Sequence, residues 1–175
     1  MPPEVLQTKA ARPPIWPWLL SALMIIVLDQ VTKIGFDHML AYGQRIAVLP
    51  VFDFTLLYNR GAAFSFLASH GGWQRWLFTG IGLVAAVVIT WLLRRHSRER
   101  LFCAALTLIL GGALGNVIDR LLHGYVIDFI LLHWNDRYFP AFNLADMAIT
   151  AGAVILILDE WLKVRRGRAA ARNAG

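Results

Sequence analysis

The sequence predicts an all-α membrane protein in which four transmembrane helices carry a small β-sheet element on the outer side of the membrane. Of the 175 residues, 58% are hydrophobic, and the mean hydropathy of +0.55 exceeds the usual range of soluble domains. Four stretches are long enough to cross about 30 Å of hydrocarbon. We expect helices at about Trp18–Phe36, Trp76–Leu93, Leu101–Leu122 and Phe142–Leu162, within one integral membrane domain that spans residues 1–175.

The first predicted helix follows a Pro-rich, polar tail, residues 1–14, which we expect to be disordered, as we do the small and basic residues 167–175. A basic tail before an apolar run that ends at Leu28 is also typical of a signal peptide, but no small-x-small cleavage site follows. The favourable insertion free energy of about ten apolar residues roughly cancels the unfavourable insertion free energy of one Asp and one Lys at mid-span. Insertion of this helix therefore requires Asp29 and Lys33 to lie toward one end. The pattern therefore predicts an uncleaved helix with a polar outer end.

Two outer segments, residues 37–72 and 123–141, connect the predicted helices. In the first, Ile46–Leu49 and Val51–Tyr58 are rich in aliphatic and aromatic residues, which indicates two short strands on the outer membrane surface. In the second segment, Asp128 lies in an apolar setting.

The second predicted helix contains no charged residue, and the short inner loop Arg94–Arg100 joins it to the third. Such a loop predicts that these two helices are antiparallel neighbours. Gly111 and Gly115 form a small-xxx-small pair on the third helix, as do Ala148 and Gly152 on the fourth. These pairs indicate close helix packing.

The Lys and Arg residues predict the orientation, because cytoplasmic segments of membrane proteins carry an excess of them. If both termini are cytoplasmic, the inner segments hold most of these residues, and the outer segments hold only Arg45, Arg60, Arg75, Arg120 and Arg137. The net charge of +6 is then explained by topology, so we expect no nucleic-acid partner.

This orientation brings polar residues from three helices to the same outer depth: Asp29 and Lys33, then Asn116, Asp119 and Arg120, then Asn143 and Asp146. Within each helix, spacings of three or four residues place them on one face. The Asp29–Lys33 pair could also simply fix helix packing, and the two asparagines could be interhelical hydrogen-bonding residues. The set also includes four carboxylates, those of Asp29, Asp119, Asp128 and Asp146. The two cations, Lys33 and Arg120, cannot neutralise all four, so at least one carboxylate should hold a proton or face water.

Several reaction types can be compared with this set. The outer helix ends contain no serine for a Ser–His arrangement, and no HExxH pattern is present. A metal site built from Asp119, His123 and Asp128 is conceivable. A pair of carboxylates that shares one proton is the remaining option, in which the ionised member draws a proton from water and the neutral member polarises a carbonyl. The single cysteine, Cys103, lies at the opposite leaflet and is expected to be a core residue.

Five blocks of the sequence resemble the prolipoprotein signal peptidases, or signal peptidase II, which are bacterial intramembrane aspartyl proteases. The blocks occur in the expected order and span most of the chain: Asp29–Lys33, Asn59–Ser65, Gly115–Arg120, Val126–Phe129 and Phe142–Asp146.

The resemblance implies that Asp128 and Asp146 are the catalytic dyad, and it assigns further roles around them. Residues that would shape the site or bind substrate are Asp29, Lys33, Asn59, Gly61, Asn116, Asp119, Arg120 and Asn143. The implied reaction removes signal peptides from prolipoproteins just before a cysteine that already carries diacylglycerol. It would use no metal or organic cofactor.

The resemblance also implies the surroundings of the enzyme. The implied protein is a monomer in contact with membrane lipid in the bacterial inner membrane, with its site toward the periplasmic face. It would be inhibited by the cyclic peptide globomycin.

Two other classes of protein are compatible with the residues alone. A proton- or ion-coupled carrier also places Asp, Asn and Lys inside the membrane, although here the inner halves of the helices offer no ionisable relay. A membrane scaffold would leave the carboxylate cluster unexplained.

Overall fold

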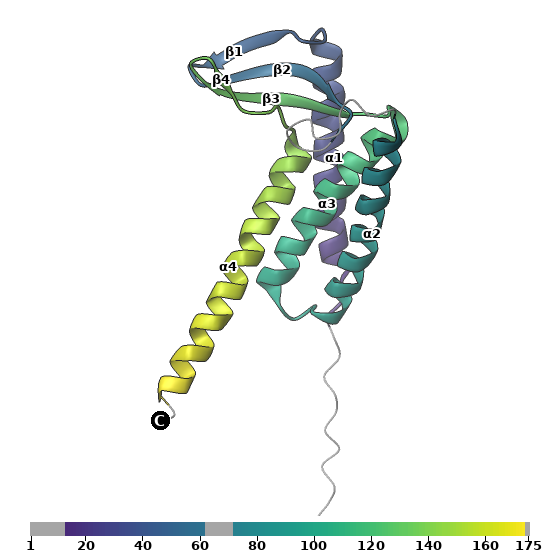
Figure 1. The fold of residues 1–175 in the computed structure, drawn as a ribbon. Coiled ribbons are helices and arrows are strands. Elements are labelled where there is room, and N and C mark those ends of the chain that lie inside the picture. The colour runs from purple at the N-terminus through teal and green to yellow at the C-terminus, as the bar shows by residue number, and fades with distance from the viewer. Residues whose placement is uncertain (1–12, 62–71, 174–175) are drawn as a thin grey trace, which may run out of the picture.

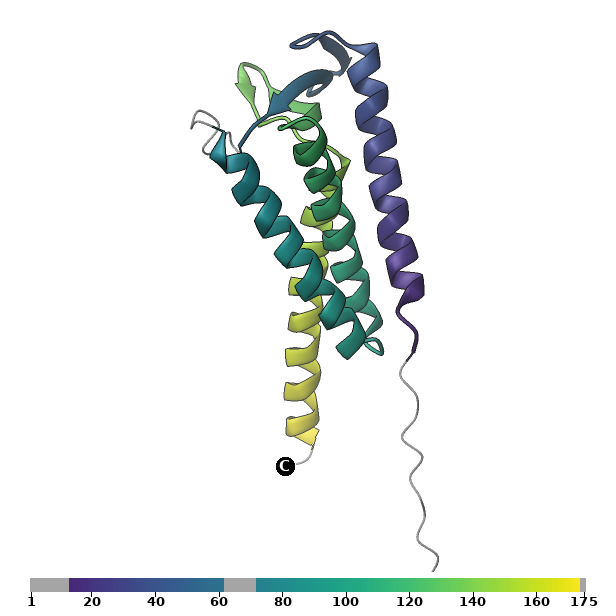
Figure 2. The ribbon, with the colours of Figure 1, turned by 90° about the vertical axis from the view of Figure 1, so that its right-hand side faces the viewer.

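The computed structural model describes residues 13–61 and 72–173, which form a helical bundle with a small sheet at one end (Figure 1). The helices are α1 (Trp16–Met39), α2 (Trp73–Arg95), α3 (Arg100–Leu122) and α4 (Leu144–Asn173). The sheet lies beside the end of α1 and the start of α4 (Figures 1 and 2). It is formed by the segment that follows α1 and by the segment between α3 and α4.

Helix α3 is the centre of the bundle, because it packs against α1, α2 and α4. Leu93, Cys103, Leu106 and Leu110 form part of a buried core where α2 and α3 meet, which confirms that Cys103 is a core residue. Many large apolar side chains of α1 and α2 are exposed, among them Val87 at 71%. Such an exposed apolar surface is suited to lipid.

Three of the described helices, α1, α2 and α3, are long and apolar enough to cross a membrane. Helix α4 is not among them, since it carries Asp146 near its start and Asp159, Glu160 and Lys163 further along. The fourth span therefore stays a prediction.

Several helices begin or end at other residues than predicted. Helix α1 begins two residues earlier than predicted and ends at Met39, and α4 begins at Leu144, after Asn143. The expectation of disorder over residues 167–175 is wrong as far as Asn173, because α4 continues through an Ala- and Arg-rich stretch of good helix formers. The expected disorder of residues 1–14 falls almost wholly outside the described residues.

The sheet has four antiparallel strands in the order β1-β2-β3-β4: β1 (Arg45–Leu49), β2 (Phe52–Asn59), β3 (Val126–Trp134) and β4 (Arg137–Tyr138). The first two confirm the predicted strands. The other two were not predicted. Strand β3 pairs with β2 so that Asp128 lies opposite Leu57 and Val126 opposite Asn59, and this pairing fixes the position of Asp128.

Close packing at the glycines of α3 is confirmed by the space around them. A Cβ atom on Gly112 would lie 2.3 Å from the carbonyl oxygen of Ala145, and one on Gly111 would lie 2.7 Å from Cβ of Ile25. On α4, a Cβ on Gly152 would lie 2.6 Å from the carbonyl oxygen of Ala105. The backbones of α1, α3 and α4 therefore approach one another more closely than any larger residue would permit.

Candidate active site

Asp128 is buried on β3 and is held by two amide side chains. Asn143 Nδ2 donates to Asp128 Oδ1 at 2.7 Å, and Asn59 Nδ2 donates to Asp128 Oδ2 at 3.2 Å. Asn59 is the last residue of β2, and its own Oδ1 accepts a 2.9 Å hydrogen bond from the backbone N–H of Gly61. The end of β2 and the start of α4 thus hold one carboxylate between them.

Asp146 lies in the first turn of α4 and forms a reciprocal cap with Asn143. The Asp146 backbone N–H donates to Asn143 Oδ1 at 3.0 Å, and the Asn143 N–H donates to Asp146 Oδ2 at 3.3 Å. This is the capping-box arrangement, in which each side chain satisfies a backbone donor that the helix leaves open. Asn143 and Asp146, which their spacing predicted to share a helix face, therefore also cap the start of α4.

Asn116 of α3 links the two carboxylates to the charged residues of α1. Its Nδ2 donates to Asp146 Oδ1 at 2.8 Å, and its Oδ1 accepts from Lys33 Nζ at 2.9 Å and from Asn143 Nδ2 at 3.3 Å. Asn143 in turn contacts both Asp128 and Asp146. One connected network thus includes both members of the predicted dyad.

Lys33 is fully buried and has three oxygen partners. Its Nζ lies 2.8 Å from Asp29 Oδ2 and 3.0 Å from Asp119 Oδ2, in addition to Asn116 Oδ1. Asp119 Oδ2 also accepts the backbone N–H of Ile127 at 3.0 Å, which ties the end of α3 to β3. The Asp29–Lys33 pair expected from the sequence is therefore part of a triad with Asp119.

Gln30 belongs to this network, although the sequence did not single it out. Its Nε2 donates to Asp119 Oδ1 at 2.8 Å and lies 3.2 Å from Asp29 Oδ2 and 3.3 Å from the Gly115 carbonyl oxygen. The only sequence signal for Gln30 is its position directly after Asp29.

Arg120 approaches the site from α3, and its guanidinium group donates two hydrogen bonds to backbone carbonyl groups. Its Nη2 donates to the Gly61 carbonyl oxygen at 3.1 Å and its Nη1 to the Asn116 carbonyl oxygen at 3.3 Å. The buried Nε atom has no hydrogen-bond partner among the described residues. All ten predicted site residues are therefore brought together in one region.

The electrostatic environment sets Asp128 apart. Burial and the nearby charge of Asp146 raise the pKa of Asp128 to about 7, against the opposing effect of the hydrogen bonds from Asn143 and Asn59. Asp146 is half-buried and lies in the first turn of α4. The raised pKa suits Asp128 to be the member of the pair that carries a proton.

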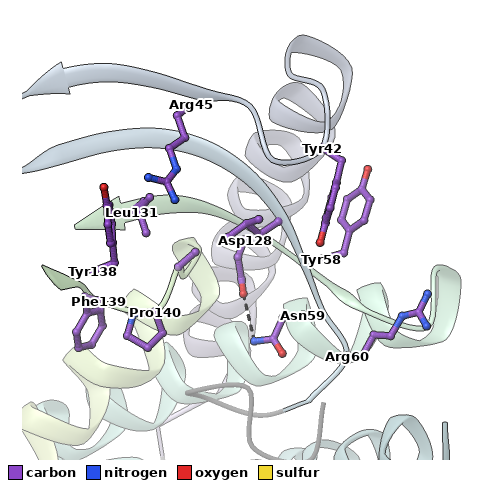
Figure 3. A pocket seen from close by; sticks show the side chains of 12 residues that line it. Tyr42, Arg45, Tyr58, Asn59, Arg60, Asp128, Leu131, Tyr138, Phe139 and Pro140 are labelled. Carbon is purple, nitrogen blue, oxygen red and sulfur yellow. Dashed lines mark hydrogen bonds between the residues drawn. The ribbon is translucent and has the colours of Figure 1, made fainter. Parts of the chain in front are cut away.

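Two cavities meet near these carboxylates. One of about 940 Å³ is lined by Asp128 together with Asn59, Leu131 and Tyr138 from the sheet (Figure 3). The other, of about 680 Å³, is lined by Asp146, Asn116 and Arg120 and continues past apolar residues of α4 such as Met147 and Ile149. Asn59, Phe139, Pro140 and Ala141 line both, so the two cavities adjoin.

The metal site considered from the sequence is not formed in the described part of the chain. Among those residues, no three His, Cys, Asp or Glu side chains are grouped so as to hold a metal ion. Asp119 instead faces Lys33 and Gln30, and Asp128 faces two asparagines.

The model of the family described as signal peptidase (SPase) II matches residues 21–162 of the chain. Several proteins with the name lipoprotein signal peptidase are similar over most of the chain. That of Paraburkholderia phytofirmans is 57% identical over 162 residues, which are 93% of this chain and 94% of that protein. That of Ralstonia nicotianae is 57% identical over 152 residues, which are 87% of this chain and 88% of that protein.

Two solved structures, each described as a bacterial membrane enzyme studied by the in meso method, have the same fold. The one at 2.3 Å resolution aligns with a TM-score of 0.76 and 30% identity, and covers 87% of this chain and 91% of its own. The one at 1.9 Å resolution aligns with a TM-score of 0.74 and 29% identity, and covers 84% of this chain and 94% of its own.

Proposed function

Because the chain belongs to the signal peptidase II family of aspartic-type peptidases, we propose that Asp128 and Asp146 form its catalytic dyad. The reaction is hydrolysis of a prolipoprotein just before its diacylglyceryl cysteine. The observation that carries the proposal is the single side chain of Asn143, which bonds Asp128 at 2.7 Å and the backbone N–H of Asp146 at 3.0 Å.

The two carboxylates take different parts in the proposed mechanism. Ionised Asp146 accepts a proton from a water molecule as the water oxygen attacks the scissile carbonyl carbon. Neutral Asp128 donates a hydrogen bond to the carbonyl oxygen, which gains negative charge in the tetrahedral intermediate. The intermediate then collapses as the C–N bond breaks, and the proton held by Asp146 passes to the leaving amine.

Other residues of the network orient substrate and dyad. Arg120 and Asn59 line the cavity beside Asp146, and Arg120 also binds the Gly61 carbonyl oxygen, which suits these three residues to hold the substrate backbone. The remaining residues position the carboxylates: Asp29, Lys33, Asn116, Asp119 and Asn143. The apolar cavity of about 680 Å³ beside Asp146 is suited to the apolar part of the substrate.

We place the site toward the periplasmic face of the inner membrane, with both termini cytoplasmic and the enzyme monomeric. A diacylglyceryl cysteine is held at the membrane surface. Asp128 lies on β3 and Asp146 in the first turn of α4, and Figure 1 shows that the start of α4 lies close to the sheet, which supports this depth. The relatives named above are peptidases, and none supports the carrier alternative.

The test is incubation of the purified protein with a diacylglyceryl-modified prolipoprotein, with release of the signal peptide followed by gel mobility. We expect cleavage of the modified precursor and not of the same precursor without lipid, and we expect globomycin to block it. Absence of cleavage by a folded preparation would contradict the proposal. Inhibition by a chelator would favour metal chemistry over the dyad.

A further inference from the structure

An arginine and a tyrosine from opposite edges of the sheet meet over one of its faces. The guanidinium carbon of Arg45, on β1, lies 4.6 Å from the ring centre of Tyr138, on β4. Strands β2 and β3 separate β1 from β4, so in a flat sheet the two backbones would be about 14 Å apart. Both side chains therefore turn inward over the same face, which Figure 3 shows as the wall of a cavity.

That cavity reaches Asp128, one member of the proposed dyad. Its lining includes Arg45 and Tyr138 on one side, and Asp128 and Asn59 nearer its middle (Figure 3). Tyr138 pairs with His133 on β3, five residues beyond Asp128, which corresponds to roughly 16 Å of extended chain. A peptide that leaves the dyad along this face would thus pass Arg45 within roughly its first five residues.

The charge of the cavity is mostly positive. Its lining residues include Arg45 and Arg60, and Asp128 is the only carboxylate among those named for it. In the described part of the chain, Arg45 has no ion pair with a carboxylate, and its contact with the Tyr138 ring leaves its N–H groups available. Arginine stacked on an aromatic ring is well placed to bind a carboxylate with two parallel hydrogen bonds.

We propose that this cavity binds the segment of the mature lipoprotein that follows the diacylglyceryl cysteine, and that Arg45 gives it a preference for an acidic side chain there. This inference rests on the proposed function and adds a substrate preference to it. The apolar cavity beside Asp146 takes the part of the substrate inside the membrane, and the sheet cavity takes the water-soluble part. An exposed ion pair of this kind corresponds to a preference of about two- to fivefold at low ionic strength.

The experiment compares prolipoproteins that differ in one residue. Glu, Gln or Lys is placed in turn at the second to fifth positions after the diacylglyceryl cysteine, and kcat/KM is measured for each. We expect kcat/KM to decrease in the order Glu, Gln, Lys at one or more positions. The ratio of kcat/KM for the Glu substrate to that for the Lys substrate should fall as salt is added. Arg45→Gln should abolish the ratio, and Arg45→Glu should reverse it.

Arg137→Gln is the matched control, because Arg137 is an exposed arginine of β4 that does not line the cavity. It removes the same charge from the same sheet and should keep the ratio. If Arg45→Gln does not fold, Arg45→Lys, which keeps the charge and loses the planar stacking, should reduce the ratio in part. Equal cleavage of all charge variants would overturn the inference, as would a ratio that Arg45→Gln leaves intact or Arg137→Gln removes. Failure to cleave any substrate would instead contradict the proposed function.

Discussion

The carboxylate of Asp29 on α1 accepts a 2.9 Å hydrogen bond from the backbone N–H of Ala145, the second residue of α4. The first N–H groups of a helix have no partner within it, and here a buried side chain from a distant helix satisfies one. Asp146 is the next residue, so the position of α1 helps to set the position of one proposed catalytic carboxylate.

Lys33→Met should therefore destabilise the protein strongly. It leaves Asp29 and Asp119 buried without their shared cation, a change that costs roughly 3–5 kcal/mol in comparable pairs. Thermal unfolding in detergent measures this. The matched control is Lys163→Met, since Lys163 pairs with Glu99 and Asp159 but is 42% exposed and should cost less than about 1 kcal/mol. Equal losses in the two variants would mean that the triad is not a stabilising unit.

Asp128→Asn and Asp146→Asn should each lower turnover by at least about 10²–10⁴-fold, because the proposed mechanism needs one acid and one base. Both variants should remain folded, since asparagine keeps the size of the side chain. Asp53→Asn is the control: Asp53 is also buried on the sheet, but it pairs with His133 at 3.2 Å, away from the network. Near-normal turnover by either dyad variant would rule out the dyad.

The pH dependence follows from the raised pKa of Asp128. Above a pKa of about 7 this residue loses the proton with which it polarises the carbonyl, so kcat/KM should fall as the pH rises through about 7. A carboxyl whose pKa is raised on folding binds its proton more tightly in the folded state. Its contribution to stability is thus complete below the ordinary value of 3.8 and is lost as the pH rises to about 7.

Melting temperatures of the parent and of Asp128→Asn across this range test the second half of that prediction. The parent should lose stability relative to the variant as the pH rises from about 4 to 7. Parallel curves would show that Asp128 keeps an ordinary pKa.

Gly112→Ala should displace α4 from α3 and reduce both stability and activity. The added Cβ would meet a backbone oxygen, that of Ala145, at 2.3 Å, and backbone cannot rotate away. Gly80→Ala on α2 is the control, since nothing lies within 4 Å of its Cβ position and alanine is the better helix former. Unfolding temperature and turnover of the two variants should diverge, and a harmless Gly112→Ala would mean that the α3–α4 interface can relax.

Labelling of an introduced cysteine in intact cells tests the orientation. Asp136→Cys, in the exposed turn between β3 and β4, should react with a membrane-impermeant maleimide, and Arg98→Cys, between α2 and α3, should react only after lysis. Cys103 is buried and should remain silent. The reverse pattern would invert the topology and place the site on the cytoplasmic face.

Much of the fold could be predicted because its signals are local. Apolar runs of membrane-spanning length gave α1, α2 and α3, and the aliphatic content around Pro50 gave β1 and β2. Strand β3 was missed because its identity as a strand depends on pairing with β2, and Asn59 and Val126, which lie opposite one another, are far apart in sequence. The end of α4 was missed because small and basic residues suit both a tail and a helix.

The site was predictable where charge made burial costly. Asp29, Lys33, Asp119 and Asp146 stand out in apolar helices, since each ionisable group there needs a partner. Gln30 did not stand out, because an uncharged amide is tolerated in many settings and its partners Gly115 and Asp119 are 85 and 89 residues away. The capping role of Asn143 was equally hidden, since it depends on where α4 begins.

The salt bridge between Lys33 and Asp29, four residues apart on α1, bears on how the chain enters the membrane. Helix α1 carries its own counter-ion, and Asp119 arrives on α3 next to Arg120, so Asp29 and Asp119 each have a cation on the same helix before any neighbouring helix is made. The partner of Asp29 on α4 and the asparagine that holds both acids come last in synthesis. The nascent protein is therefore without the proposed dyad until its final helix is in place, and hydrolysis begins only when assembly ends.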